Sequence, residues 1–311
     1  MRVWISALAL LLAFCGSGLA QPNGFWNDMG PGRLQFPPPP DPEDPDPRFS
    51  PSREGPVEDI LFQPGINLYG DAGAGALKDL SGSKGSQLCL PIALTHGFAY
   101  LRGSAGFPRL ARYRDLDRDG AADTPRDGIR HFFQACKTDR EVGTYYSEVA
   151  GCMRAYMAES GYRPWAYQIS PWATEAPPAY HLASVRRVVD VDEVRHHVGA
   201  RYLVVLAVGF YSFDASTKTF QREAGHFVNL YGYRHAQAWG AERIVLRIVN
   251  NWVDYGNRPP GRMYDEIAME RIRPRDGTTF PREAAYELTG PALSWSGYKT
   301  MVEGLFVALP L

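Results

Sequence analysis

A run of prolines and acidic residues near the start of the chain limits where a folded domain can begin. Residues 36–56 read FPPPPDPEDPDPRFSPSREGP and hold little that a core could bury. Proline lacks a backbone N–H and has a fixed φ, so such a run favours an extended polyproline conformation. We expect residues 21–55 to form a disordered, acidic, proline-rich arm, which is either an inert spacer or a pro-segment or recognition arm. The folded domain is expected to span residues 56–311.

The first twenty residues, MRVWISALALLLAFCGSGLA, have the pattern of a secretory signal peptide. Arg2 supplies a basic start, an apolar run follows, and small residues lead to Ala20. The apolar run is shorter than the roughly 20 residues that a transmembrane helix needs. We therefore expect residues 1–20 to be a signal peptide, cleaved near Ala20, and the mature protein to be secreted or periplasmic.

Composition narrows the classes of partner. The formal net charge of -1 provides no field for nucleic acid, and we find no other apolar stretch long enough to span a membrane. With 45% hydrophobic and 13% aromatic residues, the chain has material for one large core. The sequence does not specify an oligomeric state.

Two predicted helices each carry a cysteine. IRHFFQAC ends in Cys136, and GTYYSEVAGCMRAYMAESGY contains Cys152, with Thr144 as the expected N-cap and Gly161 as the expected end. If the two helices share a core, their cysteines form a disulfide. The alternative is a pair of buried, reduced cysteines.

Cys89 stands apart from this pair. Once Cys15 leaves with the signal peptide, the mature chain holds three cysteines, and an odd number suggests one bridge and one free thiol. In GSQLCLPIALTHGFAYLRG, Cys89 lies where a loop changes into a predicted helix, and Pro91 suits a first helical turn. A helix N-terminus lowers the pKa of a thiol, so Cys89 is a candidate nucleophile.

Two apolar strand patterns supply the partners that a nucleophilic thiol needs. REAGHFVNLYGYR places His226 at the head of a predicted strand, and RIVLRIVNNWVDYG ends in Asn250 and Asn251. If these strands pair, the asparagines arrive beside His226. A histidine can then take and return the proton, while a side-chain oxygen orients its ring.

The order and spacing of these residues resemble the papain-like cysteine peptidases. His226 lies 137 residues after Cys89 (226 minus 89), within the 130 to 150 typical of that family. HFVNLYGY resembles the family's histidine strand and VNNW its strand-end asparagine, whereas CLPIAL and the helix around Cys152 are similar to the bacteriocin-processing branch, which cuts after double-glycine leaders. The resemblance covers roughly Leu77 to Trp252. It implies an α+β, papain-like fold with a helical first half, the nucleophile at a helix N-terminus, and an antiparallel sheet in the second half.

The resemblance implies a hydrolase that cuts a peptide or amide bond, so that a peptide or protein substrate is the expected partner. Cys89 would be the nucleophile, His226 the acid and base, and an asparagine the orienting residue. Papain itself points to Asn250 and the processing branch to Asn251, and we favour Asn250. The same residues would also serve acyl transfer, as in transglutaminases, or a cell-wall amidase. An inactive scaffold that acts as a calcium-stabilised binding module is the alternative from another class.

The chain departs from the family at two places. Leu90 stands where the processing branch has glycine. Ser83 stands where papain-like enzymes place the glutamine of the oxyanion hole, and Gln87 is the nearest glutamine that could donate to an oxyanion.

An acidic loop precedes the helix of Cys136. RDLDRDGAADTPRDG follows the D-x-D-x-D-G pattern of calcium loops, whose oxygens suit a hard cation. The twelfth position is Arg126 where an EF-hand has glutamate, so the loop is more similar to the shorter loops of secreted calcium-binding repeats, with Asp127 as an added candidate. We expect either structural calcium or a solvated acidic turn, and no cofactor for catalysis. The expected metal ligands are Asp115, Asp117, Asp119 and Asp123.

The second half of the chain has further strand patterns and one short helix. DVDEVRHHVGA is the predicted helix, and residues 254–295 have no pattern that we can assign. The predicted strands are Tyr202 to Phe213, His226 to Arg234, Arg243 to Asn250 and the final TMVEGLFVAL.

Overall fold

A computed structural model describes most of the chain beyond residue 87. The described residues are 77, 80, 87–103, 106–110, 113–116, 118, 120–122, 124–173, 182–199, 202–235, 243–250, 264–273, 279–282, 284–294 and 296–311. The expected signal peptide, residues 1–20, and the expected arm, residues 21–55, lie outside them.

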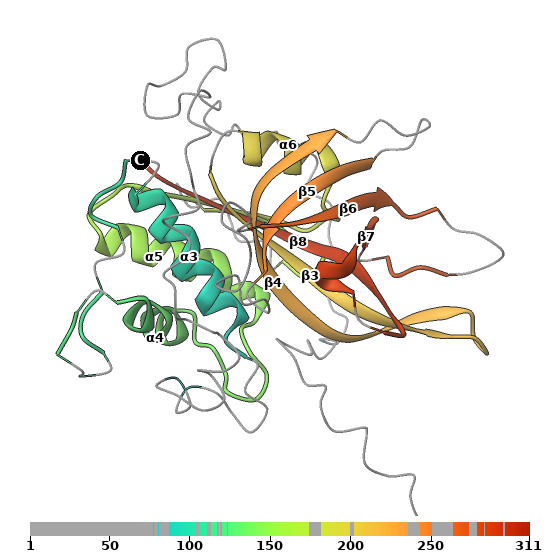
Figure 1. Ribbon diagram of the computed structural model, residues 1–311, viewed down its shortest axis with the longest axis horizontal. Coiled ribbons are helices and arrows are strands. Elements are labelled where there is room, and N and C mark those ends of the chain that lie inside the picture. The colour runs from blue at the N-terminus through green and yellow to red at the C-terminus, as the bar shows by residue number, and fades with distance from the viewer. Residues whose placement is uncertain are drawn as a thin grey trace, which may run out of the picture.

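Helices form the first half of the described chain and strands most of the second (Figure 1). Two local signals explain where helices start. Pro91 lies in the first turn of the helix that begins at Cys89, and Thr124 caps the next helix through a capping box with Asp127. The helices are α3 (Cys89–Gly103), α4 (Pro125–Ala135), α5 (Tyr146–Glu159) and α6 (Val191–Gly199), with a 3-10 turn η3 (Pro291–Leu293).

The strands form one mixed sheet that is antiparallel except at one edge. Its order is β2-β1-β8-β3-β4-β5-β6-β7, and only β1 and β2 pair in parallel. Because β7 also pairs with β8, the strands from β8 to β7 close into a barrel. The strands are β1 (Pro164–Ile169), β2 (Leu182–Val185), β3 (Leu203–Asp214), β4 (Thr219–His235), β5 (Arg243–Val249), β6 (Asp265–Arg271), β7 (Tyr286–Thr289) and β8 (Tyr298–Pro310).

These elements confirm the expected α+β class with a largely antiparallel second half. The predicted strands and the short helix are found, each within a few residues of its expected bounds except β4. That strand begins at Thr219, so His226 lies inside it and the prediction that His226 heads the strand was wrong. Residues 254–295, which had no assignable pattern, contribute β6, β7 and η3, and these elements close the barrel.

The predicted disulfide between the two helices is present. Cys136 and Cys152 are bonded with their Cα atoms 5.0 Å apart. Beside them Phe98, Phe132 and Tyr156 form an aromatic cluster with ring centroids 4.7 to 5.4 Å apart. Three helices therefore share one apolar core, which gives the physical reason why the cysteines meet.

The expected N-cap of α5 was wrong. The helix begins one residue later than a Thr144 cap would place it, and its N-cap is Tyr145, which makes no side-chain capping bond. The hydroxyl of Thr144 instead lies 2.6 Å from that of Thr138, inside the protein. Gly161 does follow the end of α5 and has a φ of 76°, a left-handed conformation that favours glycine.

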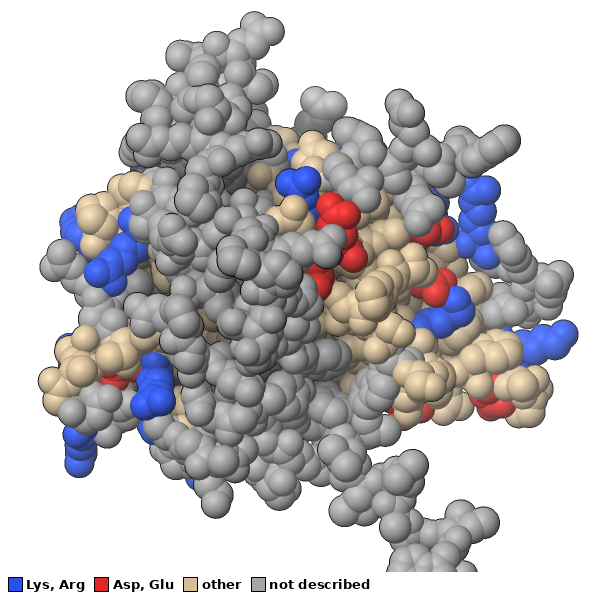
Figure 2. Space-filling model, in the orientation of Figure 1, with Lys and Arg blue, Asp and Glu red and all other residues tan. Residues whose placement is uncertain are grey.

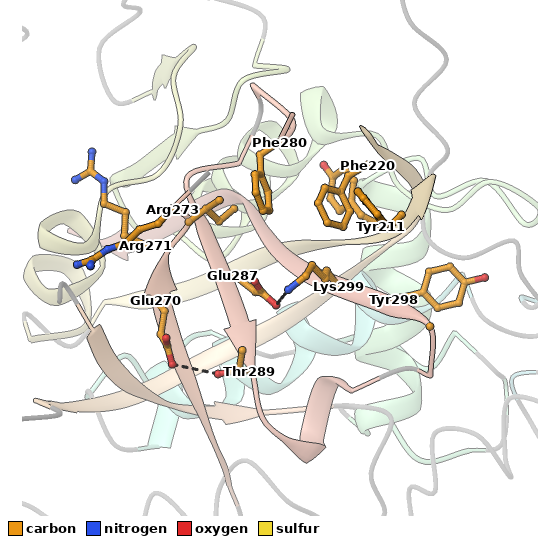
Figure 3. Close-up of a pocket in the computed structure, with 13 residues that line it drawn as sticks. Tyr211, Phe220, Glu270, Arg271, Arg273, Phe280, Glu287, Thr289, Tyr298 and Lys299 are labelled. Atoms are coloured by element: carbon orange, nitrogen blue, oxygen red, sulfur yellow. Dashed lines mark hydrogen bonds and ion pairs between the residues drawn. The ribbon is translucent and has the colours of Figure 1, made fainter. Parts of the chain in front are cut away.

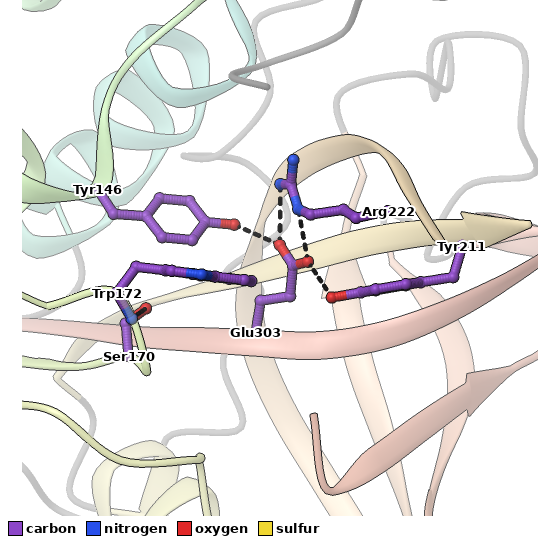
Figure 4. A network of polar contacts seen from close by, with 6 residues as sticks. All are labelled: Tyr146, Ser170, Trp172, Tyr211, Arg222 and Glu303. Atoms are coloured by element: carbon purple, nitrogen blue, oxygen red, sulfur yellow. Dashed lines mark hydrogen bonds and ion pairs between the residues drawn. The ribbon is translucent and has the colours of Figure 1, made fainter. Parts of the chain in front are cut away.

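A buried carboxylate connects the helical half to the sheet. Glu303 on β8 has a fully buried side chain, and both of its oxygens accept from Arg222 on β4, at 2.7 and 3.0 Å. Tyr146, the first residue of α5, donates its hydroxyl to Glu303 at 2.7 Å, and Tyr211 on β3 donates at 2.6 Å (Figure 4). Burial, followed by the charge of Glu303, raises the pKa of both tyrosines, so both remain protonated donors.

Two backbone features make room for this carboxylate. The pairing of β8 with β3 shifts between Ala207 and Val208, and Glu303 is the extra residue of the resulting bulge. A bulge redirects a side chain relative to a regular strand. A Cβ atom on Gly209 would lie 2.0 Å from Glu303 Oε1, so a glycine is required opposite it. We call Tyr146, Tyr211, Arg222 and Glu303 the Glu303 cluster.

On the sheet half of the face shown in Figure 2, the charged side chains of the described residues do not form a field of one sign. Acidic and basic side chains of the described residues are interspersed over the sheet half of that face. This mixing agrees with the formal net charge of -1. Among the described residues, no helix is long and apolar enough to cross a membrane.

Replacing Glu303 by glutamine tests whether the Glu303 cluster stabilises the fold. The change leaves the largely buried Arg222 without its counter-charge, and breaking such a pair costs about 3–5 kcal/mol. We expect urea unfolding to show a loss of that size. The control is Glu287→Gln, because Glu287 pairs with the partly exposed Lys299 and such pairs contribute about 1 kcal/mol or less. Equal losses in the two variants would contradict the assigned role.

Candidate active site

Two of the residues expected to act together are joined by a hydrogen bond. His226 on β4 and Asn250, directly after β5, lie with Nε2 and Oδ1 3.1 Å apart. The strands pair antiparallel with Asn229 opposite Val249, and this register brings the end of β5 back beside His226. The pairing expected from the sequence is therefore confirmed for Asn250, while Asn251 lies outside the described residues.

Asn250 is held in one orientation. Its side-chain amide donates to the backbone carbonyl of Ala292 in η3 at 2.7 Å, so the oxygen of the same amide faces His226. The 3-10 turn is itself fixed, because the hydroxyl of Thr300 on β8 donates to the carbonyl of Leu293 at 2.7 Å. The turn belongs to the segment that carried no sequence signal, so this support for Asn250 was missed.

The histidine is neutral in this environment. His226 is 1% exposed, and burial lowers the pKa of its imidazole to about 3, with the bond to Asn250 opposing that shift. Asn250 is completely buried as well. Because Nε2 is engaged with Asn250 Oδ1, a proton exchanged with a thiol would have to pass through Nδ1.

The helix of Cys89 packs on the strand of His226. Asn229 on β4 donates its side-chain amide to the carbonyl of Ala93 in α3 at 2.9 Å, and both residues are buried. Ala93 is one helical turn beyond Cys89, and Asn229 is three strand residues beyond His226. This bond fixes the first turns of α3 against β4. It was missed at the sequence level, since an asparagine inside an apolar strand has no signature of its own.

Cys89 lies at the first residue of α3, as expected, but it is not the free thiol that was expected. Its sulfur is part of a disulfide whose other half lies outside the described residues. The side chain is 4% exposed. The prediction of a free thiol assumed a chain without its first twenty residues, whereas the structure is that of a chain that still contains Cys15.

Gln87 lies two residues before Cys89 and is completely buried. One of its amide N–H groups donates to the carbonyl of Glu141 at 3.0 Å. Glu141 is in the turn between Asp139 and Gly143, which bond to each other through their backbones. Gln87 is therefore attached to the loop between α4 and α5, and its role as an oxyanion donor stays a prediction.

The acidic loop is described only in part. Asp115 accepts from the backbone N–H of Gly120 at 3.0 Å, whereas Asp117, Asp119 and Asp123 lie outside the described residues. Asp127 is completely buried and both of its oxygens are engaged, since Oδ1 accepts from the backbone N–H of Leu116 and Oδ2 accepts from Thr124 in the capping box. No group of three or more metal-binding side chains is found among the described residues. Calcium binding stays a prediction.

The buried imidazole makes stability depend on pH. The unfolded chain binds a proton on His226 near pH 6.5 and the folded chain only near pH 3, so the folded state holds fewer protons between those values. We expect the contribution to be complete above pH 6.5, to fall by a few kcal/mol as the pH drops toward 3, and then to level off. Urea unfolding at several pH values measures it. In His226→Phe this part of the pH dependence should disappear, and an unchanged profile would contradict a buried neutral histidine.

Comparisons with known proteins do not identify the chain. Scans against protein-family models, curated proteins and solved structures each found no significant match. What the site can do must therefore follow from its own residues. Among these, His226 and Asn250 form a hydrogen-bonded pair.

Proposed function

We propose that the mature protein is a secreted or periplasmic cysteine hydrolase that cleaves a peptide or amide bond. Cys89 is the nucleophile, His226 the acid and base, and Asn250 the residue that orients the imidazole. The observation that carries the proposal is the bond between His226 Nε2 and Asn250 Oδ1, with Asn250 anchored on Ala292. The location of Cys89 at the start of a helix supports its role as a nucleophile, because the helix dipole stabilises a thiolate.

The proposed reaction has two steps. The Cys89 thiolate attacks the carbonyl carbon, a carbon–sulfur bond forms, and the amine leaves with a proton from His226. A water molecule then gives a proton to His226 and attacks the thioester, which releases the carboxylic acid and restores the thiol. Gln87, two residues before Cys89, is the proposed side-chain donor to the oxyanion.

The mechanism requires the Cys89 sulfur as a thiolate, so its disulfide must open. The 311-residue chain has four cysteines, and cleavage near Ala20 would separate Cys15 from the backbone of the mature chain. Three cysteines cannot all pair within one mature chain, and Cys136 is bonded to Cys152. If the signal peptide is cleaved before the Cys89 sulfur is oxidised, no cysteine remains in the mature chain to pair with Cys89, which stays a thiol. Once the disulfide has formed, a reductant must break the S–S bond, with two electrons and two protons, to free the Cys89 thiol.

Acyl transfer is a close variant of this proposal. The same three residues would form the same thioester, and an amine in place of water would give a transglutaminase-like product. A cell-wall amidase differs only in its substrate. The products formed with and without added amine distinguish these reactions.

A binding module on an inactive scaffold is the second candidate. Two observations favour it. Cys89 is in a disulfide, and His226 is 1% exposed, with burial lowering the pKa of its imidazole so that the ring stays neutral. In that case the hydrogen bond between His226 and Asn250 would stabilise the fold, and neither residue would take part in catalysis.

The pH dependence of Cys89 alkylation separates the two candidates. The mature chain from Gln21 is treated with a mild reductant and then iodoacetamide, and mass spectrometry locates the label. An active site predicts rapid labelling of Cys89 well below pH 8, because an imidazolium partner stabilises the thiolate. In His226→Ala the apparent pKa should return to about 8.5, with labelling at pH 6 at least about tenfold slower.

His197→Ala is the matched control, because His197 is another buried histidine and burial lowers its pKa to about 4. This control should keep the labelling profile of the parent protein. If the parent and His226→Ala share one profile near pH 8.5, the hydrolase proposal fails and the binding module remains. Loss of peptide hydrolysis in Asn250→Ala, by about tenfold or more, would support its orienting role.

We also propose that the loop from Asp115 to Asp123 binds calcium for stability. The left-handed conformations of Arg118, with a φ of 60°, and of Gly120, with a φ of 89°, support a tight turn around its oxygens. Calcium at millimolar concentration should raise the Tm by a few degrees, and Asp115→Asn should abolish the shift. Asp214→Asn, in an exposed turn, is the control that should retain it. An equal shift in Asp115→Asn would contradict the site.

A further inference from the structure

A pocket opens at the end of the barrel where the β3–β4 hairpin meets β6, β7 and β8. Its volume is about 890 Å³, within the range of roughly 300 to 1,000 Å³ typical of ligand sites. Barrel mouths are a common place for such sites. Phe220 in its wall lies six residues before His226 on the same strand, which is about 20 Å at 3.3 Å per residue. The pocket is therefore separate from the candidate active site.

Aromatic side chains form one wall of the pocket. Phe220 and Phe280 stack with centroids 4.9 Å apart and planes 28° apart, and Phe213 lies 5.0 Å from Phe220 (Figure 3). Tyr211, whose hydroxyl is bonded to Glu303, and Tyr298 complete the lining on that side. Phe213 is 47% exposed, so part of its ring faces solvent at this mouth.

The position of Phe280 is set by the backbone. Thr279 forms a parallel bridge with Thr219 at the start of β4, and its N–H donates to the carbonyl of Lys218 at 2.9 Å. The aromatic wall is therefore attached to the sheet. Its surface is formed before a ligand arrives, which lowers the entropic cost of binding.

Charged side chains lie across from this wall. The lining includes three cations and two anions, a net charge of +1. Lys299 is paired with Glu287 at 2.5 Å, and Glu270 accepts a long bond from Thr289. Arg271 and Arg273 are exposed at the end of β6, and Figure 3 shows both on the same side of the pocket. A ligand in the pocket would meet an apolar wall and a cationic rim.

We propose that this pocket binds an extended, acidic, proline-rich peptide from a partner protein. Proline-rich peptides are already extended and dock on aromatic-lined grooves with little loss of entropy. Acidic residues of the peptide would face Arg271 and Arg273, while its proline rings would pack on Phe213 and Phe280. A sequence of this chemistry occurs in the chain itself, as FPPPPDPEDPDP at residues 36–47.

The test measures binding of a labelled synthetic peptide, FPPPPDPEDPDP, to the mature chain by fluorescence anisotropy. We expect saturable binding that weakens at least about tenfold in Phe280→Ser and several-fold in Arg273→Glu. Raising the salt concentration from 50 to 300 mM should weaken it, and so should replacing Asp and Glu in the peptide by Asn and Gln. Tyr145→Ser, which removes an exposed aromatic side chain that does not line the pocket, is the control and should bind like the parent.

The mature chain contains the peptide's sequence at residues 36–47, and these residues would compete with the added peptide for the pocket. A second measurement tests this competition. A second protein, with Asp41, Glu43, Asp44 and Asp46 changed to Asn or Gln, is measured beside the parent. Binding by either protein that is lost in the matching Phe280→Ser variant supports the pocket. Absence of saturable binding in both proteins, or binding that Phe280→Ser leaves unchanged, overturns the proposal. Circular dichroism of each variant verifies that it is folded.

Discussion

The buried carboxylate of Glu303 holds the two halves of this protein together. A charge with no exposed surface is costly unless it is fully bonded, and here an arginine and two tyrosines supply four bonds. These donors come from β3, β4 and the first residue of α5. The bonds therefore form only when the helical half and the sheet are correctly placed, which links the formation of the two halves.

The candidate active site depends on the same arrangement. Asn229 ties α3 to β4, and the register of β4 with β5 returns Asn250 to His226. Each contact joins an element from the first half to the sheet, or two strands of the sheet. The hydrolase and the inactive scaffold would have the same fold around these residues. They would differ in whether the Cys89 sulfur is a thiolate or part of a disulfide, and in whether His226 is protonated.

The two proposed functions of the molecule lie in different parts of the sheet. The chemistry is placed where β4 and β5 approach the helices, and the peptide pocket is placed at the open end of the barrel. Tyr211 links the pocket to the Glu303 cluster, because its ring lines the pocket and its hydroxyl donates a hydrogen bond to Glu303. A ligand at the barrel mouth would therefore contact one side chain of the Glu303 cluster.

Much of the fold followed from local sequence pattern. Pro91 and the apolar spacing marked α3, apolar runs marked β3, β5 and β8, and shared helix faces indicated the Cys136 to Cys152 disulfide. The pairing of His226 with Asn250 was predictable because two adjacent antiparallel strands set it. These features depend on residues close in the chain or on one strand pairing.

The tertiary structure decided the features that depend on distant segments. The start of β4 before His226 is set by its pairing with the long hairpin partner β3, and the short strands β6 and β7 are defined by their neighbours rather than by periodicity. The Glu303 cluster combines residues up to 157 positions apart, at a bulge that no local pattern marks. By itself, the sequence determined the α+β class and the residues able to carry chemistry. Only the folded chain decided their burial and partners, because those depend on which remote surfaces exclude water.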